Sequence, residues 1–478
     1  MHTFCDTYHV MKLPAEFIAA TSSAPSFVYR KKDFVFDLRD AERIAKCEKN
    51  LKDQLHERWE KAKDHNAFNY SLNCLYKCLD GKYDLSMQLN TERGELRRKP
   101  MHFKNIKEPF NQHRFNFTKL HDHEILFYLK CEDEPITEDP LDRHLIAVNA
   151  SPLERDHSLV IPSVNKCHPQ VLNPIAVRTA IDLMLLVHDT DFHMLFNSLL
   201  GLASVNHLHL HCLYWPYDSD LINRRCEQLH DVTDAFIIRP PQWICQAFVF
   251  QLTSEDGYEH FKSQVFKCVD YLTEMNQAHN VFFSRAQPIR TTGPEKEEDR
   301  RSQRPSYVTA YVFPRLNMIG AKPPSNFNPA ANELAGNLTS YKEDRRSQRP
   351  SYVTAYVFPR LNMIGAKPPS NFNPAANELA GNLTSYTVRF FESATETSVI
   401  RIIEEEATLD NEEFEILCYD LSDILKGRKI GTSRPKEDFK FEGLTSPEID
   451  ELRDSFQSFM PRSPTAGHKE KRTMSSLN

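Results

Sequence analysis

Residues 204–215 read Ser-Val-Asn-His-Leu-His-Leu-His-Cys-Leu-Tyr-Trp, and this stretch decides the interpretation of the whole chain. Side chains of a β-strand alternate between its two faces. If the stretch is a strand, its histidines share one face: His207, His209 and His211. The intervening apolar residues face the other way and predict packing on a core. Three imidazoles in a row predict chemistry, because imidazole acts as nucleophile, proton carrier or metal ligand near neutral pH.

Three interpretations of this histidine row are open from the residues alone. Each ring could simply be satisfied by local hydrogen bonds. A His-x-His pair could hold zinc together with a third ligand from elsewhere, although the nearest acidic residues, Asp191 and Asp218, are distant in sequence. A neutral imidazole could instead attack the phosphorus of a phosphate ester while its neighbours fix the tautomer and stabilise charge. The third interpretation is favoured, because alternation places all three rings together.

Composition excludes several classes of protein. The chain has 478 residues and a net charge of −7, without a concentrated basic stripe, which argues against nucleic acid as a partner. With only 13 glycines, a glycine-rich nucleotide loop is not expected. The longest apolar run, 172–187, is interrupted by Arg178 and Asp182, so no membrane span is expected. Eleven scattered cysteines and no recognisable secretory signal predict reduced thiols in the cytoplasm.

Helices and strands are expected to be mixed along the chain. The sequence predicts a surface helix within 34–61, a buried helix over 175–187 and an amphipathic helix over 257–277. Alternating or short apolar runs predict strands, at 83–90, 145–148, 158–162, 192–199, 205–215, 243–252 and 281–285. The polar composition of 429–478 predicts a disordered tail. This order of elements indicates an α+β protein.

One segment of the chain occurs twice without a single change. Residues 298–341 recur as 343–386, and each copy contains a predicted strand, at 307–315 or 352–360, and a helix start after Asn328 or Asn373. Structural repeats normally diverge, so identity indicates a very recent duplication or a faulty gene assembly. A domain has room for one such strand in a given place, and the sequence does not say which copy occupies it.

Several segments resemble the histidine-triad superfamily, which includes the galactose-1-phosphate uridylyltransferases. The triad itself resembles that superfamily, and its surroundings resemble the GDP-hexose phosphorylase branch. The segments that carry this resemblance are Phe115–Lys119, Gln88–Asn90 with Arg97–Pro100, Val148–Pro162, and Phe192–Leu199 leading to Ala203–His209. The resemblance spans residues 65–425, apart from one copy of the repeat. It implies two histidine-triad-like lobes of antiparallel sheet with packed helices, at 65–235 and 236–428, after an N-terminal extension at 1–64.

The resemblance also implies a reaction. His209, the middle histidine, would attack the α-phosphorus of GDP-D-glucose and expel glucose 1-phosphate, and phosphate would then release GDP from guanylyl-histidine. Such covalent catalysis predicts ping-pong kinetics. His207 and His211 would orient the ring and donate hydrogen bonds to phosphate oxygens. The uridylyltransferases carry glutamine at the position of His211, which disfavours a hexose-phosphate transferase. A nucleotide hydrolase, a dinucleoside polyphosphate phosphorylase and a non-catalytic guanine-nucleotide-binding regulator are the alternatives.

Phosphate charge requires hydrogen-bond donors in a dry site. The candidate substrate-binding residues are Lys119, Asn197, Ser204, Asn206 and Arg315, or Arg360 in the second copy. The basic stretch at 97–99 is more typical of a solvated turn. The reaction needs no metal ion, although magnesium assistance stays possible, and its co-substrate is inorganic phosphate. The uridylyltransferase relatives pair as dimers, so a homodimer is possible.

Overall fold

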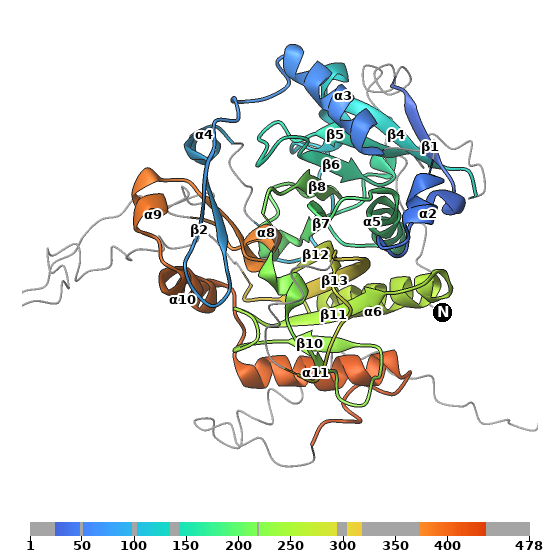
Figure 1. The fold of residues 1–478 in the computed structure, drawn as a ribbon, viewed down its shortest axis with the longest axis vertical. Helices are drawn as coiled ribbons and strands as arrows, with labels where there is room; N and C mark the ends of the chain where they lie inside the picture. Colours follow the sequence, from blue (N-terminus) through green and yellow to red (C-terminus); the bar gives the residue numbers. More distant parts are fainter. Residues whose placement is uncertain are drawn as a thin grey trace, which may run out of the picture. The chain divides into compact units, whose positions relative to one another are not determined.

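The short apolar runs of the sequence form the strands of one large sheet. The computed structural model describes residues 24–47, 51–97, 103–133, 143–217, 219–293, 304–317 and 372–435. Within them the sheet has eleven strands in the order β1-β4-β5-β6-β8-β7-β12-β13-β11-β10-β9 (Figure 1). The strands are Ser26–Tyr29 (β1), Ile125–Cys131 (β4), His144–Val148 (β5), Ser158–Ile161 (β6), Phe192–Asn197 (β7), Leu210–Tyr214 (β8), Glu227–Gln228 (β9), Phe236–Ile238 (β10), Ala247–Leu252 (β11), His279–Ala286 (β12) and Tyr307–Pro314 (β13). All neighbouring strands are antiparallel except β1 and β4.

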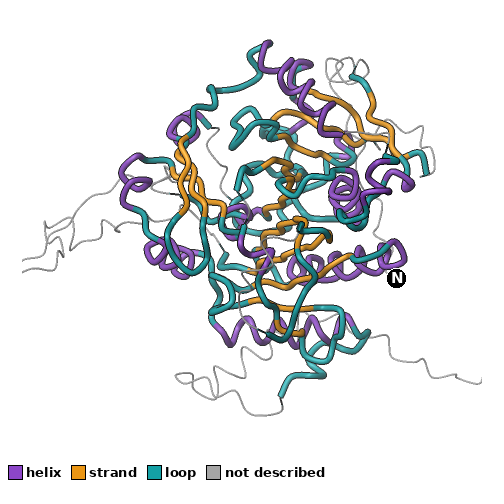
Figure 2. The backbone as a smooth tube through the Cα atoms, viewed as in Figure 1, coloured by secondary structure: helices purple, strands orange, loops and turns teal. Residues whose placement is uncertain are grey.

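Two layers cover the large sheet, one on each face (Figure 2). Four helices contribute to the main core on the first face, namely Leu51–Asp64 (α3), Pro174–Leu186 (α5), Tyr258–Glu274 (α6) and Asn411–Leu425 (α11). The second face carries a three-stranded sheet in the order β14-β3-β2, with the strands Asn382–Ser385 (β14), Ser86–Leu89 (β3) and Leu75–Cys78 (β2). Three helices complete this second layer, namely Ala376–Leu379 (α8), Val388–Ser393 (α9) and Glu396–Glu406 (α10).

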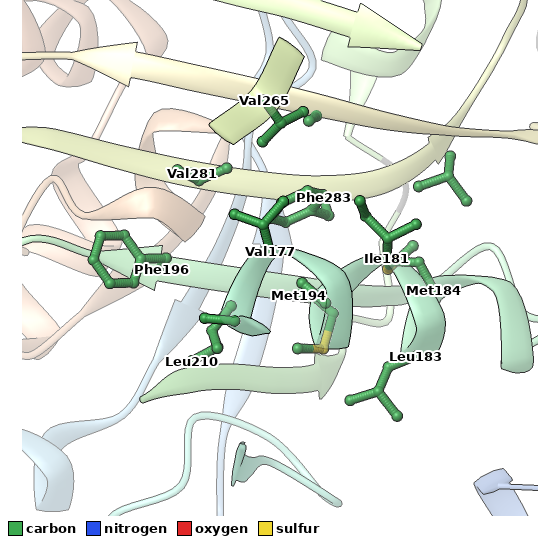
Figure 3. Packing of buried hydrophobic residues seen from close by; sticks show 14 of the residues in the cluster. Val177, Ile181, Leu183, Met184, Met194, Phe196, Leu210, Val265, Val281 and Phe283 are labelled. Carbon is green, nitrogen blue, oxygen red and sulfur yellow. The ribbon is translucent and has the colours of Figure 1, made fainter. Parts of the chain in front are cut away.

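The residues between the histidines pack against the first of these layers. Leu208, Leu210 and Cys212 are buried in the main core, which also contains the inner face of α5. Figure 3 shows Leu210 close to Met194 of β7 and Val177 of α5. The histidines therefore project from the opposite face of the sheet, as alternation requires. This burial anchors the segment that carries the histidines.

The strand of histidines is shorter than the sequence predicts. The expected strand covered 205–215, but β8 begins only at Leu210. Upstream, the backbone makes other bonds: the N–H of Leu208 donates to the carbonyl of His168 at 2.8 Å, and that of His209 donates to the side chain of Gln170 at 2.9 Å. His207 and His209 therefore lie on an irregular lead-in to β8, and only His211 is within the strand.

The α+β class is confirmed, and the large sheet continues through both predicted lobes. β7, from the first predicted lobe, pairs with β12, from the second, with Asn197 opposite Asn280. The N-terminal extension also joins the sheet, because β1 pairs with β4. The surface helix expected within 34–61 is divided into Ala41–Ala45 (α2) and α3, whose buried face includes Leu51, Leu55 and Trp59.

The two identical copies each supply a part of the fold. β13 comes from the first copy, whereas α8 and β14 come from the second. Arg315, at the end of β13, joins them by donating a hydrogen bond to the carbonyl of Pro374. The predicted strand at 352–360 and the helix start after Asn328 lie outside the described residues.

The last described residues extend beyond the point where the tail was expected to begin. Ser433 donates from its N–H and its hydroxyl to the carboxylate of Asp423 in α11, at 3.0 and 2.6 Å. Residues 436–478, the remainder of the predicted tail, lie outside the described residues. In the part of the chain that the structure describes, no helix has the length and apolar character needed to cross a membrane.

Candidate active site

The histidine row lies where β7 ends and the chain enters β8. The last β7–β8 pair joins Leu195 to His211. Two residues beyond it the strands no longer pair, and Nε2 of Gln170 bridges the carbonyls of Asn197 and His209. Asn197 and His209 lie on the face of the sheet opposite the main core, which buries Phe196, Leu208 and Leu210. That face is the one covered by the small sheet and α8. The site therefore lies between the large sheet and the second layer.

His209 has the geometry of an imidazole nucleophile. Its Nδ1 lies 2.7 Å from the carbonyl oxygen of His207. A carbonyl only accepts hydrogen bonds, so Nδ1 carries the proton and Nε2 keeps its lone pair. Burial lowers the pKa of His209 to about 4, while the bond to the His207 carbonyl partly opposes this shift. His209 is therefore neutral near pH 7, and the lone pair of its ring lies on Nε2.

His207 uses both ring nitrogens inside the protein. Its Nδ1 accepts a hydrogen bond from the N–H of Phe117 at 3.0 Å, so Nε2 carries the proton and donates to the carbonyl of Val164 at 3.1 Å. The ring of Phe117 also packs edge-on against His209, with centroids 4.9 Å apart. His207 thus fastens the segment around Phe117 to the triad, and its nitrogens have protein partners in place of the expected phosphate oxygens.

His211 keeps a ring proton that it can donate to a ligand. The N–H of Leu153 donates to Nδ1 of His157 at 2.8 Å, which leaves the proton of this ring on Nε2. That Nε2 lies 3.1 Å from Nδ1 of His211 and 3.2 Å from Nδ2 of Asn149. Because an amide nitrogen does not accept hydrogen bonds, the proton of His157 is donated to His211. His211 therefore accepts at Nδ1 and carries its own proton on Nε2. Burial, and then the neighbouring His209, His157 and Arg93, hold the pKa of His211 well below its usual range.

Of the predicted substrate-binding residues, Asn197 lies beside the segment of His209, because Nε2 of Gln170 bonds to the backbone carbonyls of both. The side-chain oxygen of Asn197 accepts hydrogen bonds from Nδ2 of Asn280 at 2.7 Å and from the N–H of Ala376 at 3.1 Å. Because these contacts occupy the oxygen, the Nδ2 of Asn197 is left as the group that can donate, on the face that carries His209. Ser204 is half-buried in the turn three residues before His207.

The other three predicted substrate-binding residues contact protein groups. Asn206 donates to the carbonyls of Glu108 and Pro109 at 3.0 Å and accepts from the N–H of Gln170 at 2.9 Å. Lys119 is exposed and donates to the carbonyl of Arg114 at 2.8 Å.

Arg315 is fully buried at the end of β13. Its guanidinium donates to the carbonyl of Glu406 at 3.0 Å and to that of Pro374, and it lies 3.4 Å from the side-chain oxygen of Asn280. Burial lowers its pKa to about 10, so the group is still charged at pH 7. Through these contacts Arg315 connects β13 to the second layer.

Two residues near the triad were not predicted from the sequence to belong to the site. Gln170 is fully buried and hydrogen-bonds to the backbone of His209. Arg93, in Thr91–Leu96 (α4), donates to the carbonyl of Ser151, and its charge contributes to the lowered pKa of His157 and His211. Gln170 lies in a loop without periodicity, and Arg93 lies beside a basic stretch that looks solvated. In neither case does the local sequence indicate the contact.

The hydrogen-bond partners of the histidine rings are other groups of the protein. Among the described residues, no group of three or more histidine, cysteine or acidic side chains is arranged to hold a metal ion. The ring nitrogens instead bond to backbone carbonyls, backbone N–H groups and each other. The zinc interpretation therefore receives no support from this arrangement.

The chain is similar to a set of sugar-nucleotide phosphorylases. Residues 50–213 match the family described as "GDPGP1-like, N-terminal domain". GDP-D-glucose phosphorylase 1 of Caenorhabditis elegans is 64% identical over 470 residues, covering 96% of this chain and 88% of that protein. The protein of the same name from Danio rerio is 34% identical over 65% of this chain and 86% of its own length. The yeast Ap4A phosphorylase Apa2 with AMP aligns over 75% of this chain and 96% of its own, at 13% identity and a TM-score of 0.43.

Proposed function

Because the chain belongs to the GDP-D-glucose phosphorylase family, we propose that it cleaves GDP-D-glucose with inorganic phosphate to give GDP and glucose 1-phosphate. The observation that carries this proposal is the state of His209. Its Nδ1 proton is held by the His207 carbonyl at 2.7 Å, so the Nε2 lone pair is free for attack on phosphorus. A histidine held in this way suits transfer of the guanylyl group.

The reaction proceeds in two displacements at the α-phosphorus. In the first, Nε2 of His209 forms a bond to phosphorus, and the bond from phosphorus to the bridging oxygen breaks. Glucose 1-phosphate leaves with that electron pair. In the second, an oxygen of inorganic phosphate forms a bond to the same phosphorus, and the bond to Nε2 breaks. GDP is released, and the lone pair returns to His209.

In the proposed reaction, three groups stabilise the charge that develops on the phosphate oxygens. His211 presents a proton on Nε2, because its Nδ1 faces the donor on His157 at 3.1 Å. Asn197 presents its Nδ2 on the face that carries His209. Arg93 adds positive charge close enough to lower the pKa of His211. Donors and charges of this kind act strongly in a site that excludes water.

The proposed reaction uses phosphate as co-substrate and requires no resident metal ion. Protein donors and the covalent histidine supply the chemistry, and any effect of magnesium would be assistance to the phosphate groups. Ten cysteines of the described residues are free thiols, which supports a proposed location in the reducing cytoplasm. A homodimer remains a prediction from the uridylyltransferase resemblance.

A product assay tests the proposed function directly. The protein is incubated with GDP-glucose, with and without phosphate, and the nucleotides and sugars are separated. GDP and glucose 1-phosphate that form only with phosphate are the expected products. GMP alone would indicate a hydrolase, and the absence of any product would indicate a binding protein. A His209→Asn protein that still turned over would contradict the nucleophile assignment, whereas acid-labile, base-stable guanylate on the wild type would support it.

A further inference from the structure

The side chain of Gln170 occupies the place of a strand partner beside His209. β8 pairs with β6 up to Leu210 and with β7 up to His211. One residue before β8, the N–H and C=O of His209 therefore lack the ladder bonds that a strand would provide. Buried backbone groups require such partners. At this point the carboxamide of Gln170 lies between the end of β7 and the segment that leads into β8.

The carboxamide satisfies both backbone groups of His209 and links them to β7. Its Oε1 accepts the N–H of His209 at 2.9 Å. Its Nε2 donates to the carbonyl of His209 at 3.0 Å and to the carbonyl of Asn197 at 3.0 Å. The residue is fully buried, so water does not compete for these bonds. A single side chain thus fixes the position of the His209 backbone against the end of β7.

The segment that carries Gln170 is itself held in place. The N–H of Gln170 donates to the side-chain oxygen of Asn206 at 2.9 Å. The carbonyl of His168 accepts the N–H of Leu208 at 2.8 Å. Asn206 is in turn anchored to the carbonyls of Glu108 and Pro109. Residues 168–170 therefore run beside 206–209 as a substitute for a strand.

We infer that Gln170 is the positioning residue of the nucleophile. The ring of His209 bonds at Nδ1 to the carbonyl of His207, only two residues away, and at both residues the backbone departs from the strand pairing of β8. Gln170 takes over the backbone bonds that this departure would leave open, and so directs Nε2 toward the α-phosphorus. It acts through His209 and touches no reacting atom. This inference rests on the proposed function, because the reacting atom is Nε2.

The test compares Gln170→Met with the wild type in a single turnover. Methionine has a similar length and volume but makes none of the three amide bonds. Rapid quenching with GDP-glucose, without phosphate, measures how fast guanylate is attached to His209 in the folded fraction. We expect a rate about 100-fold lower, since a displacement of about 1 Å has effects of that size. The GDP-glucose concentration that gives half of the maximal attachment rate stays within about threefold, because the substrate contacts are unchanged.

Gln246→Met is the matched control. Gln246 is also buried, and its Nε2 donates to the backbone carbonyl of Leu409 at 2.9 Å, beside the main core; β11, which follows Gln246, is three strands away from β7 in the large sheet. This variant also loses a buried bond between an amide and the backbone. We expect a lower thermal midpoint and an unchanged rate of guanylate attachment. A general loss of stability would instead slow both variants to a similar degree.

Gln170→Glu provides a second readout if the methionine variant does not fold. A carboxylate would place negative charge beside the imidazole of His209 and raise its pKa, so the acid limb of guanylate attachment moves to higher pH than in the wild type. Methionine or glutamate variants that attach guanylate within threefold of the wild-type rate, with an unmoved acid limb, overturn the inference. A wild type that forms no product contradicts the proposed function instead.

Discussion

The pH dependence of guanylate attachment should reveal the buried state of His209. An ordinary histidine has a pKa near 6.5, whereas burial lowers that of His209 to about 4. The nucleophile is the neutral ring. At pH 5.5 about 97% of His209 would be neutral with the lower pKa, compared with about 9% with the ordinary one. The two cases differ by about tenfold in rate at this pH.

The appropriate assay is a pH jump followed by rapid quenching. The enzyme is held at pH 7.5 and mixed with GDP-glucose in buffers between pH 5 and 7.5, without phosphate. Tryptophan fluorescence reports the folded fraction in each sample, and the amount of acid-labile guanylate is divided by that fraction. We expect the rate to change by less than about twofold from pH 7.5 to 5.5. Inorganic phosphate is omitted because its own ionisation changes over this range.

One result would refute the reasoning about His209. If the rate falls about tenfold between pH 7.5 and 5.5, with a midpoint near 6.5, the nucleophile titrates like an exposed histidine. The desolvation that lowers its pKa would then be absent from the working enzyme. Repeating the experiment with His211→Gln shows which ring titrates. A fall in rate caused by protonation of His211 disappears in that variant, whereas one caused by His209 does not.

Three further outcomes are expected from other parts of the molecule. His193 is buried against Phe282 and has its pKa lowered to about 3 by burial; the unfolded chain therefore takes up a proton first as pH falls below about 6.5, and stability declines. Urea titrations should show that His193→Leu loses about 1.4 kcal/mol less than the wild type between pH 7.5 and 5.5, and equal losses would contradict the shift. Arg315→Ala, which leaves the carbonyls of Pro374 and Glu406 without their donor, should lower the free energy of unfolding by about 3 kcal/mol, whereas Arg360→Ala at the same position of the other copy should change it by less than about 0.5 kcal/mol. If Arg315→Ala alone leaves the free energy of unfolding unchanged but Arg315→Ala with Arg360→Ala lowers it, the second copy can replace the first in the fold. His157→Phe removes the donor that sets the tautomer of His211 and should lower kcat more than His157→Gln, and equal kcat values would show that the tautomer does not matter.

The sequence by itself determined on which face of the segment the histidines lie. Strand alternation requires Leu208 and Leu210 to face opposite to His207 and His209, and the structure buries the leucines in the main core. The same reasoning predicted the α+β class and most strands, because short apolar runs bounded by polar turns seldom form anything else. The motifs around the triad predicted the family, which the similarity to known phosphorylases confirms.

Only the tertiary structure decided how the three histidines divide their roles. Alternation treats them alike, but the partners of each ring come from segments that are distant in sequence: Phe117 and Val164 engage His207, and His157 engages His211. Gln170, 39 residues before His209, hydrogen-bonds to the backbone of His209, and no local pattern in the sequence indicates this contact.

The duplicated segment shows the same division between sequence and structure. Identical copies have identical local preferences, so no property of the sequence could choose between them. The fold takes β13 from the first copy and α8 with β14 from the second. Periodicity reports which face a residue presents, because it depends on local backbone geometry. Which distant residue contacts that face depends on the tertiary fold, and these contacts form only when the layers pack together.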